Sequence, residues 1–127
     1  MTQQANVTLN SVVYAPAGTT NGLSTWVNRS GAVGNSFSKI SEKFAEPSKD
    51  GQVQRMNFSL AIPIVAADDT ACVCAGGVLR TSTVQISVWV PLTSTSAERI
   101  DFWTRLKDFV LSDPIKLGIE NLDPSWG

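Results

Sequence analysis

Three segments in the first two-thirds of the chain alternate apolar and polar residues with a period of two. They cover residues 37–45, 55–65 and 78–92, and their polar positions carry mostly small side chains. The middle segment shows the pattern best: Met56, Phe58, Leu60 and Ile62 alternate with Arg55, Asn57, Ser59 and Ala61. Successive side chains of a strand point to opposite faces of its sheet. The pattern therefore predicts an antiparallel sheet with one face toward a core and the other toward solvent.

Two turn signals divide the N-terminal part of the chain. A short alternating strand begins at Val7, and the Ala-Pro-Ala-Gly sequence at 15–18 is expected to end it. The dipeptide Asn21-Gly22 is the second signal, and a further apolar segment, 23–27, follows it. These features predict short strands ahead of the three long ones.

The last quarter of the chain is predicted to be helical. Thr95 and Glu98 form a capping box, and Asp113-Pro114 is expected to end the first helix and to supply the N-cap and first residue of a second. An apolar stripe follows the capping box at helical spacing: Ile100, Trp103, Leu106 and Val110. A meander of strands followed by two helices is an α+β pattern, and 127 residues suit a single domain covering 1–127.

The first helix carries more apolar surface than its own sheet could cover. Phe102 and Phe109 widen its stripe beyond half of the helix circumference. Either the two helices bury each other, or a second copy of the chain receives the extra face. The low charge of the chain agrees with the second option, because charged residues make up 17% of it against about 25% in an ordinary soluble domain.

Composition also excludes several kinds of chemistry. The chain has no histidine and two cysteines, so it lacks the commonest general base and cannot form a structural Cys/His zinc site. We find no nucleophile motif and no glycine-rich phosphate loop, and we expect no enzyme, no cofactor, no metal and no small-molecule substrate. No apolar run is long enough to span a membrane, and the first residues lack the basic region of a secretory signal.

The order of these elements, together with several local strings, resembles the coat proteins of the single-stranded RNA bacteriophages, the leviviruses. Residues 21–27 resemble the family segment that enters the sheet, and 55–65, with its Ile62-Pro63 step, resembles the long penultimate strand. Residues 84–91 resemble the last strand, and the capped helix with the break at 113–114 resembles the C-terminal helix pair. The resemblance covers nearly the whole chain.

The resemblance implies an N-terminal β-hairpin, a five-stranded antiparallel sheet and two C-terminal helices. In the family, two chains join edge to edge in an obligate homodimer, and each chain's helices reach across its partner. Ile100, Trp103, Leu106 and Val110 would then lie in the dimer interface. Dimers of the family build an icosahedral shell around the genome, so we expect a virion capsid protein assembled in the cytoplasm of a bacterial host.

The resemblance also implies that one sheet face binds RNA, both as genome and as a hairpin that serves as a translational operator. Carried over by position, that face comprises Lys39, Ser41, Lys43, Arg55, Asn57, Ser59, Thr83, Gln85 and Ser87. The cations would meet phosphates and the neutral side chains could hydrogen-bond unpaired bases, despite a net charge of −1. A merely solvated sheet face is the alternative interpretation. Neutral Ala61 and Ser87 make this face plainer than in some members, which favours genome packaging over tight operator binding.

The loop 66–77 contains two cysteines, Cys72 and Cys74, and matches the family loop around the symmetry axes. Some family members cross-link neighbouring subunits through two cysteines there, so the likeness makes both residues candidates for inter-subunit disulfides formed after lysis. Two free thiols are the alternative. Asp68 and Asp69 in the same loop are interpreted as solvated carboxylates rather than a catalytic pair.

Two other functions compete with the coat-protein hypothesis. A free-standing dimeric RNA-binding regulatory protein could have the same architecture without forming a shell. A small α+β enzyme is the other, and the missing catalytic motifs argue against it. The four tryptophans (Trp26, Trp89, Trp103 and Trp126) are interpreted as core or interface residues rather than as a ligand cage.

Overall fold

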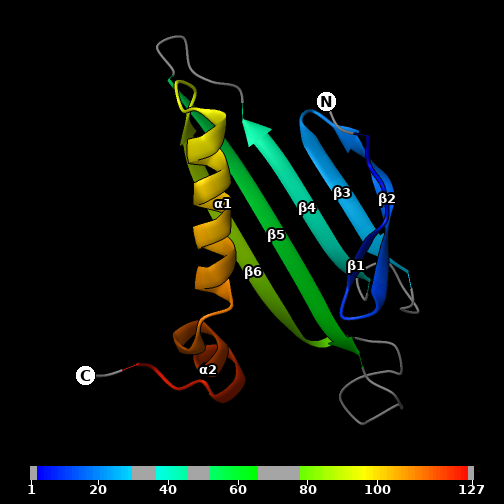
Figure 1. Cartoon of the computed structure of the whole chain (residues 1–127). Coiled ribbons are helices and arrows are strands. Elements are labelled where there is room, and N and C mark those ends of the chain that lie inside the picture. The colour runs from blue at the N-terminus through cyan, green and yellow to red at the C-terminus, as the bar shows by residue number, and fades with distance from the viewer. Residues whose placement is uncertain (1–2, 30–36, 46–51, 66–77, 126–127) are drawn as a thin grey trace. The chain divides into compact units, whose positions relative to one another are not determined.

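The strands form one six-stranded sheet in the order β1-β2-β3-β4-β5-β6, so strands that follow one another in the chain are also neighbours in the sheet (Figure 1). The computed structural model describes residues 3–29, 37–45, 52–65 and 78–125. The chain divides into two units, 1–89 and 90–127. The strands are Val7–Leu9 (β1), Val12–Thr20 (β2), Leu23–Asn28 (β3), Ser38–Ala45 (β4), Val53–Val65 (β5) and Val78–Pro91 (β6).

This antiparallel sheet confirms the expected fold class, with a difference in strand count. The expectation was an N-terminal hairpin beside a five-stranded sheet, whereas the hairpin strands are the first two of six. The strand β2 serves both parts: Val12 to Tyr14 pair with β1, and Ala15 to Thr20 pair with β3. The hairpin is therefore continuous with the sheet.

The expectation that 15–18 ends the first strand is wrong. The turn comes earlier, at Asn10 and Ser11, which both have positive φ angles of 48° and 64°, as a tight hairpin turn requires. The strand β2 then runs through Pro16, and its register with β3 shifts between Pro16 and Gly18. A bulge accommodates a proline because the extra residue lies outside the ladder of hydrogen bonds, and Gly18 adopts a φ of +120° there.

The Asn21-Gly22 turn is confirmed. Both residues have positive φ angles, 52° and 77°, which is the geometry of a type I′ hairpin turn. Gly22 also lies close to the next strand, because the amide of Phe44 donates to the Gly22 carbonyl at 3.3 Å. A side chain at Gly22 would have its Cβ 3.1 Å from the Phe44 carbonyl oxygen. The turn therefore requires glycine for both conformation and space.

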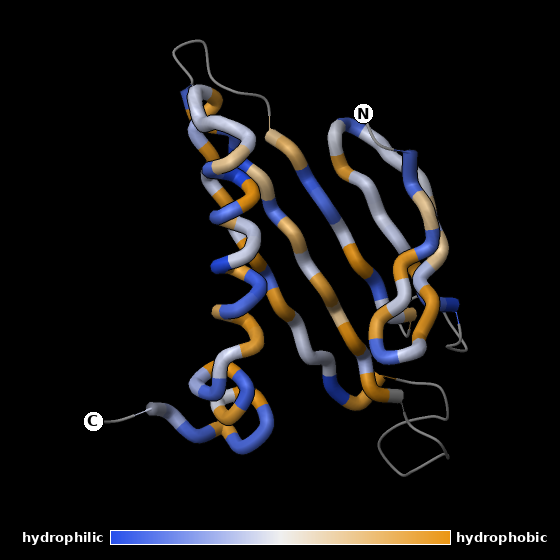
Figure 2. Tube along the Cα trace, viewed as in Figure 1, coloured by the Kyte–Doolittle hydropathy of each residue, from blue (hydrophilic) through white to orange (hydrophobic). Residues whose placement is uncertain are grey.

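The core of the strand unit lies where β3, β4 and β5 pair in register. Trp26 is opposite Ile40, and Ile40 is opposite Leu60, so these three side chains share one face. Further along the same face, the rings of Phe44 and Phe58 meet edge to face with centroids 6.3 Å apart. These contacts confirm the predicted apolar face, and Figure 2 shows the alternation of hydrophobic and hydrophilic residues along β5.

Polar side chains tie the N-terminal segment and the hairpin to the sheet. Trp26 Nε1 donates to the Ala5 carbonyl at 2.9 Å, and Gln4 Nε2 donates to the Thr25 carbonyl at 3.0 Å. Tyr14 is 3% exposed, and its hydroxyl lies 2.7 Å from Ser38 Oγ. Ser38 Oγ in turn donates to the Ala61 carbonyl at 3.0 Å, so a chain of hydrogen bonds runs from β2 through β4 to β5.

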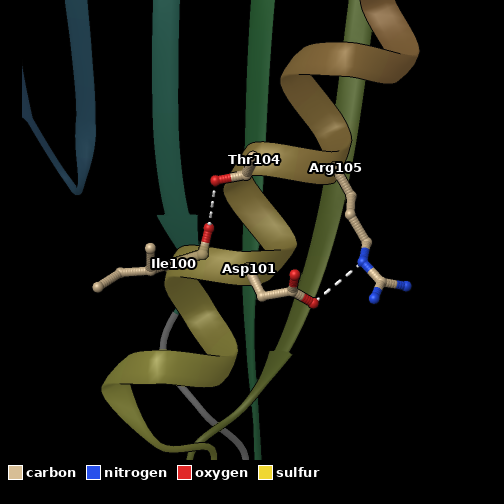
Figure 3. A network of polar contacts seen from close by, with 4 residues as sticks. All are labelled: Ile100, Asp101, Thr104 and Arg105. Carbon is tan, nitrogen blue, oxygen red and sulfur yellow. Dashed lines mark hydrogen bonds and ion pairs between the residues drawn. The ribbon is translucent and has the colours of Figure 1, made fainter.

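The C-terminal unit contains the two predicted helices, Ser96–Val110 (α1) and Asp113–Asn121 (α2). The capping box is confirmed: the Glu98 amide donates to Thr95 Oγ1 at 3.2 Å, and the Thr95 amide donates to Glu98 Oε2 at 3.3 Å. Within α1, Thr104 Oγ1 donates to the Ile100 carbonyl, and Arg105 pairs with Asp101 at 3.0 Å (Figure 3). In the described part of the chain, neither helix is both long and apolar enough to cross a bilayer.

The expectation that Asp113 is the N-cap of the second helix is wrong. Ser112 occupies that position and makes no side-chain cap bond, while Pro114 lies within the first turn of α2. Ser112 Oγ instead donates to the Phe109 carbonyl at 2.5 Å, at the end of α1. Because proline needs no amide partner anywhere in a first turn, the helix begins one residue earlier than predicted. Asp113 then lies in that first turn, where a negative charge is favourable.

Candidate nucleic-acid interface

Strand register places six of the nine predicted RNA-binding residues on one face of the sheet. Ser41 is opposite Ser59, Lys43 is opposite Asn57, and Lys39 is opposite Ala61. Arg55 is opposite Ala45 at the next position of the same alternation. We call this surface the polar face, formed by the odd-numbered residues of β3, β4, β5 and β6. The opposite surface, with Trp26, Ile40 and Leu60, is the apolar face.

A side-chain hydrogen bond brings β6 into the polar face. Ser87 Oγ donates to Asn57 Oδ1 at 2.7 Å, so Ser87 points to the same side of the sheet as Asn57. Alternation along β6 puts Gln85 and Thr83 on that side as well, and all three side chains are exposed. The structure therefore brings together all nine residues that the sequence predicted, on three adjacent strands.

The hydroxyls and amides of the polar face hydrogen-bond one another across the strands. The Ser41 and Ser59 hydroxyls are bonded to each other, and Ser87 is bonded to Asn57. Such pairs hold the side chains in fixed positions, and each group keeps further capacity, since a hydroxyl has two lone pairs and an amide has two N–H donors. The face thus presents ordered polar groups to a ligand.

The charge of the polar face is positive, whereas that of the whole chain is −1. Lys39, Lys43 and Arg55 lie on it and are exposed. Among the described residues of β3 to β6, no carboxylate shares this face, because Glu42 is opposite Ser24 and Phe58 on the apolar face. Three cations without a neighbouring anion form a surface suited to phosphate groups.

One large aromatic side chain on the polar face was not among the predicted RNA-binding residues. Trp89 is 59% exposed, whereas its neighbour Val88 is 7% exposed. The alternation that puts Ser87 on the polar face puts Trp89 there too. The period of two in 78–92 could have shown this, but tryptophan was interpreted by residue type as a core or interface residue.

The predicted dimer-interface residues lie on α1 and are exposed or half-exposed in a single chain. Trp103 is 60% exposed, Ile100 and Val110 are also exposed, and Leu106 is intermediate. Across the whole of the two described helices, no side chain is buried. Figure 2 shows hydrophobic positions recurring along α1 between hydrophilic ones. An apolar surface of this kind marks a site of protein association.

The remaining predicted residues cannot be placed in the same way. Cys72 and Cys74 lie outside the described residues, as do Asp68 and Asp69. Within the described ranges, no group of three or more Cys, Asp or Glu residues is arranged to hold a metal ion.

Comparison with known proteins agrees with the arrangement of strands and helices. The family model described as "Levivirus coat protein" matches residues 2–126. The structure resembles the virus-like particle of Beihai levi-like virus 21, with a TM-score of 0.87 and 17% identity over 99% of this chain and 100% of that one. It also resembles the virus-like particle of bacteriophage NT-214, with a TM-score of 0.83 and 18% identity over 98% and 100% of the two chains.

A third solved structure shares the fold at lower identity. The bacteriophage GA protein capsid aligns with a TM-score of 0.74 and 13% identity over 91% of this chain and 88% of that one. No curated protein matches the chain in sequence. Because the family model spans nearly all 127 residues, the chain belongs to the levivirus coat protein family and is a structural capsid protein rather than an enzyme.

Proposed function

We propose that this chain forms homodimers, that the dimers assemble into an icosahedral shell, and that the polar face binds single-stranded RNA inside it. The same face would bind an RNA hairpin as a translational operator. One observation carries the RNA part of the proposal: Lys39, Lys43 and Arg55 share a face that holds no described carboxylate. In this scheme residues 1–127 act as one coat-protein domain, located in the virion capsid and assembled in the host cytoplasm.

The proposed roles of the residues follow from their chemistry. The three cations would bind phosphate oxygens, which contribute affinity without reading sequence. The serine, asparagine and glutamine side chains would hydrogen-bond the edges of unpaired bases and the 2′-hydroxyls. Two copies of the face in a dimer would present six cations. A charge pattern of this kind favours packaging of many sequences over recognition of one.

The proposed dimer is supported by the exposed apolar surface of α1. Ile100, Trp103 and Val110 are exposed in the single chain, and a second copy of the chain would cover them. An interface that carries this much apolar surface belongs with obligate dimers, which bury more than about 2,000 Å². Folding and dimerisation would then be one process, with stability that depends on protein concentration.

The proposal includes the two cysteines as candidates for inter-subunit disulfides, on the family likeness of the loop 66–77 alone. The cytosol would keep both thiols reduced until lysis. A non-reducing gel of assembled particles tests this part by itself. Oligomers that disappear on reduction are expected, and a band of monomer only would contradict it.

RNA binding is tested by salt-dependent binding of Lys43→Ala and Arg55→Ala. Each variant removes one phosphate contact, so the slope of log K against log salt should fall by about 0.7 per contact for single-stranded RNA. Arg80→Ala is the matched control, because Arg80 lies on β6 in alternation with the apolar face. Unchanged affinity and slope in both polar-face variants would refute the assignment of the site.

Shell formation is tested by electron microscopy of the purified recombinant protein, with and without added RNA. Closed particles are expected. A protein that stays dimeric and still binds RNA would instead be the free-standing regulatory protein that shares this architecture.

A further inference from the structure

We propose that Trp89 is a stacking platform on which the polar face holds an unpaired nucleobase of single-stranded RNA. The inference rests on the proposed RNA-binding function and names a contact that the cations and hydroxyls cannot make. It assigns a ligand-binding role to a residue type that sequence reasoning placed in a core or an interface.

The first step is the position of the indole. The hydrogen bond from Ser87 to Asn57 fixes which side of β6 faces the polar surface. Val88 points to the opposite side and is 7% exposed, while Trp89 is 59% exposed. A tryptophan is usually buried on most of its surface because of its large apolar area. This one is presented to solvent on the same face as the cations.

The second step is the set of neighbours. Since β5 and β6 are adjacent antiparallel strands, the residue two positions after Ser87 lies beside the residue two positions before Asn57. That residue is Arg55, which is exposed. On the far side of Arg55 the register partner is Ala45, whose methyl group leaves room above the sheet. Trp89 therefore has a phosphate-binding cation at its side and a low surface beyond it.

The third step is the chemistry of the missing partner. Trp103 lies in an apolar stripe with Ile100 and Val110, which suits a protein partner. Trp89 instead adjoins Ser87 and Arg55, so a hydrophobic protein surface placed there would bury polar groups and a charge without partners. A nucleotide satisfies both parts of this environment, since it carries a flat aromatic base and an anionic phosphate.

The contact should favour unpaired bases without reading their identity. Every base has a π face, so stacking on an aromatic side chain tolerates any sequence. Bases inside an A-form duplex are already stacked and out of reach. Trp89 would therefore favour loops and single strands over duplex, in agreement with a surface that packages many sequences.

The test compares Trp89→Ala, Trp89→Leu and Trp89→Phe in the full-length chain. The probes are a labelled 12-nucleotide RNA of mixed A and U without secondary structure, and a blunt RNA duplex. Trp89→Ala and Trp89→Leu should weaken single-strand binding about 5- to 100-fold, leaving the salt slope and duplex binding unchanged. Trp89→Phe should retain most of the affinity, because it keeps an aromatic face.

A fluorescence measurement reads the stacking directly. The single-stranded RNA should quench tryptophan emission in the wild type, and the quenching should be lost in Trp89→Phe although this variant still binds. This comparison decides the matter even if Trp89→Ala fails to fold. Quenching that persists in Trp89→Phe, or Trp89→Leu binding as tightly as the wild type, would overturn the inference.

The outcomes also separate this inference from the proposed function. A wild type that binds RNA with a salt slope reduced by Lys43→Ala, together with an unchanged Trp89→Ala, would overturn only the stacking role. A wild type that binds neither probe would overturn both.

Discussion

The hydrogen-bond chain from Tyr14 through Ser38 to the Ala61 carbonyl allows a prediction with a definite sign. Ser38 has one hydroxyl proton and donates it to Ala61, so the bond between Tyr14 and Ser38 must be donated by Tyr14. The Tyr14 hydroxyl is on a side chain that is 3% exposed. The two single variants that break this bond should therefore have unequal costs.

The magnitudes follow from which group is left without a partner. Tyr14→Phe removes the donor and leaves Ser38 still bonded to Ala61, which should cost about 1 kcal/mol of unfolding free energy. Ser38→Ala leaves the Tyr14 hydroxyl buried without an acceptor, which should cost about 2–3 kcal/mol. Adding Tyr14→Phe to Ser38→Ala removes that orphaned hydroxyl, so the double variant should regain about 1 kcal/mol relative to Ser38→Ala.

Urea unfolding of the full-length chain, followed by circular dichroism, measures these differences. All variants must be compared at one subunit concentration, because association stabilises the folded state by mass action. A change of 1 kcal/mol should move the midpoint by about 0.3–1 M urea. The control is Ser24→Ala, which breaks the exposed hydroxyl pair between Thr19 and Ser24 at 2.9 Å and should change stability by about 0.5 kcal/mol or less. Additive costs, with the double variant least stable, would refute the reasoning.

Three further substitutions test local features of the fold, each by the same unfolding measurement. Thr95→Ala removes the α1 cap and should cost about 1 kcal/mol, whereas Thr95→Ser should retain the cap; equal stability of the two would contradict the capping role. Gly22→Ala should cost about 1–2 kcal/mol, because its φ is +77° and its Cβ would meet the Phe44 carbonyl oxygen. Asp101→Ala breaks an exposed pair with Arg105 and should change stability by about 0.5 kcal/mol or less; a larger loss would show that the pair does more than decorate the helix surface.

The polar face could be predicted from the sequence because strand side chains alternate with a strict period of two. Once 37–45 and 55–65 are strands, Lys43 and Asn57 can only point away from the apolar positions between them. The capping box at Thr95 was equally accessible, since it is a local pattern of three hydrogen-bonding groups. In each case the determining interaction lies within a few residues of chain.

Features that depend on a neighbouring strand or helix were predicted less well. The strand β2 continues through Pro16 because a bulge against β3 accommodates it, and a proline seen in sequence alone reads as a strand end. The second helix begins at Asp113 because Ser112 is already bonded to the end of α1. Residue type also misled the interpretation of Trp89, whose exposure follows from its face of the sheet.

The sequence by itself determined which side chains share a face and where α1 begins, because alternation and capping are short-range consequences of backbone geometry. It also carried enough pattern to indicate the coat-protein family. Only the tertiary structure decided which residues lie opposite one another, such as Lys43 with Asn57 and Ser87 with Asn57. Strand register arises from contacts between segments far apart in the chain, and those contacts brought three separate alternating segments together into one cationic surface beside Trp89.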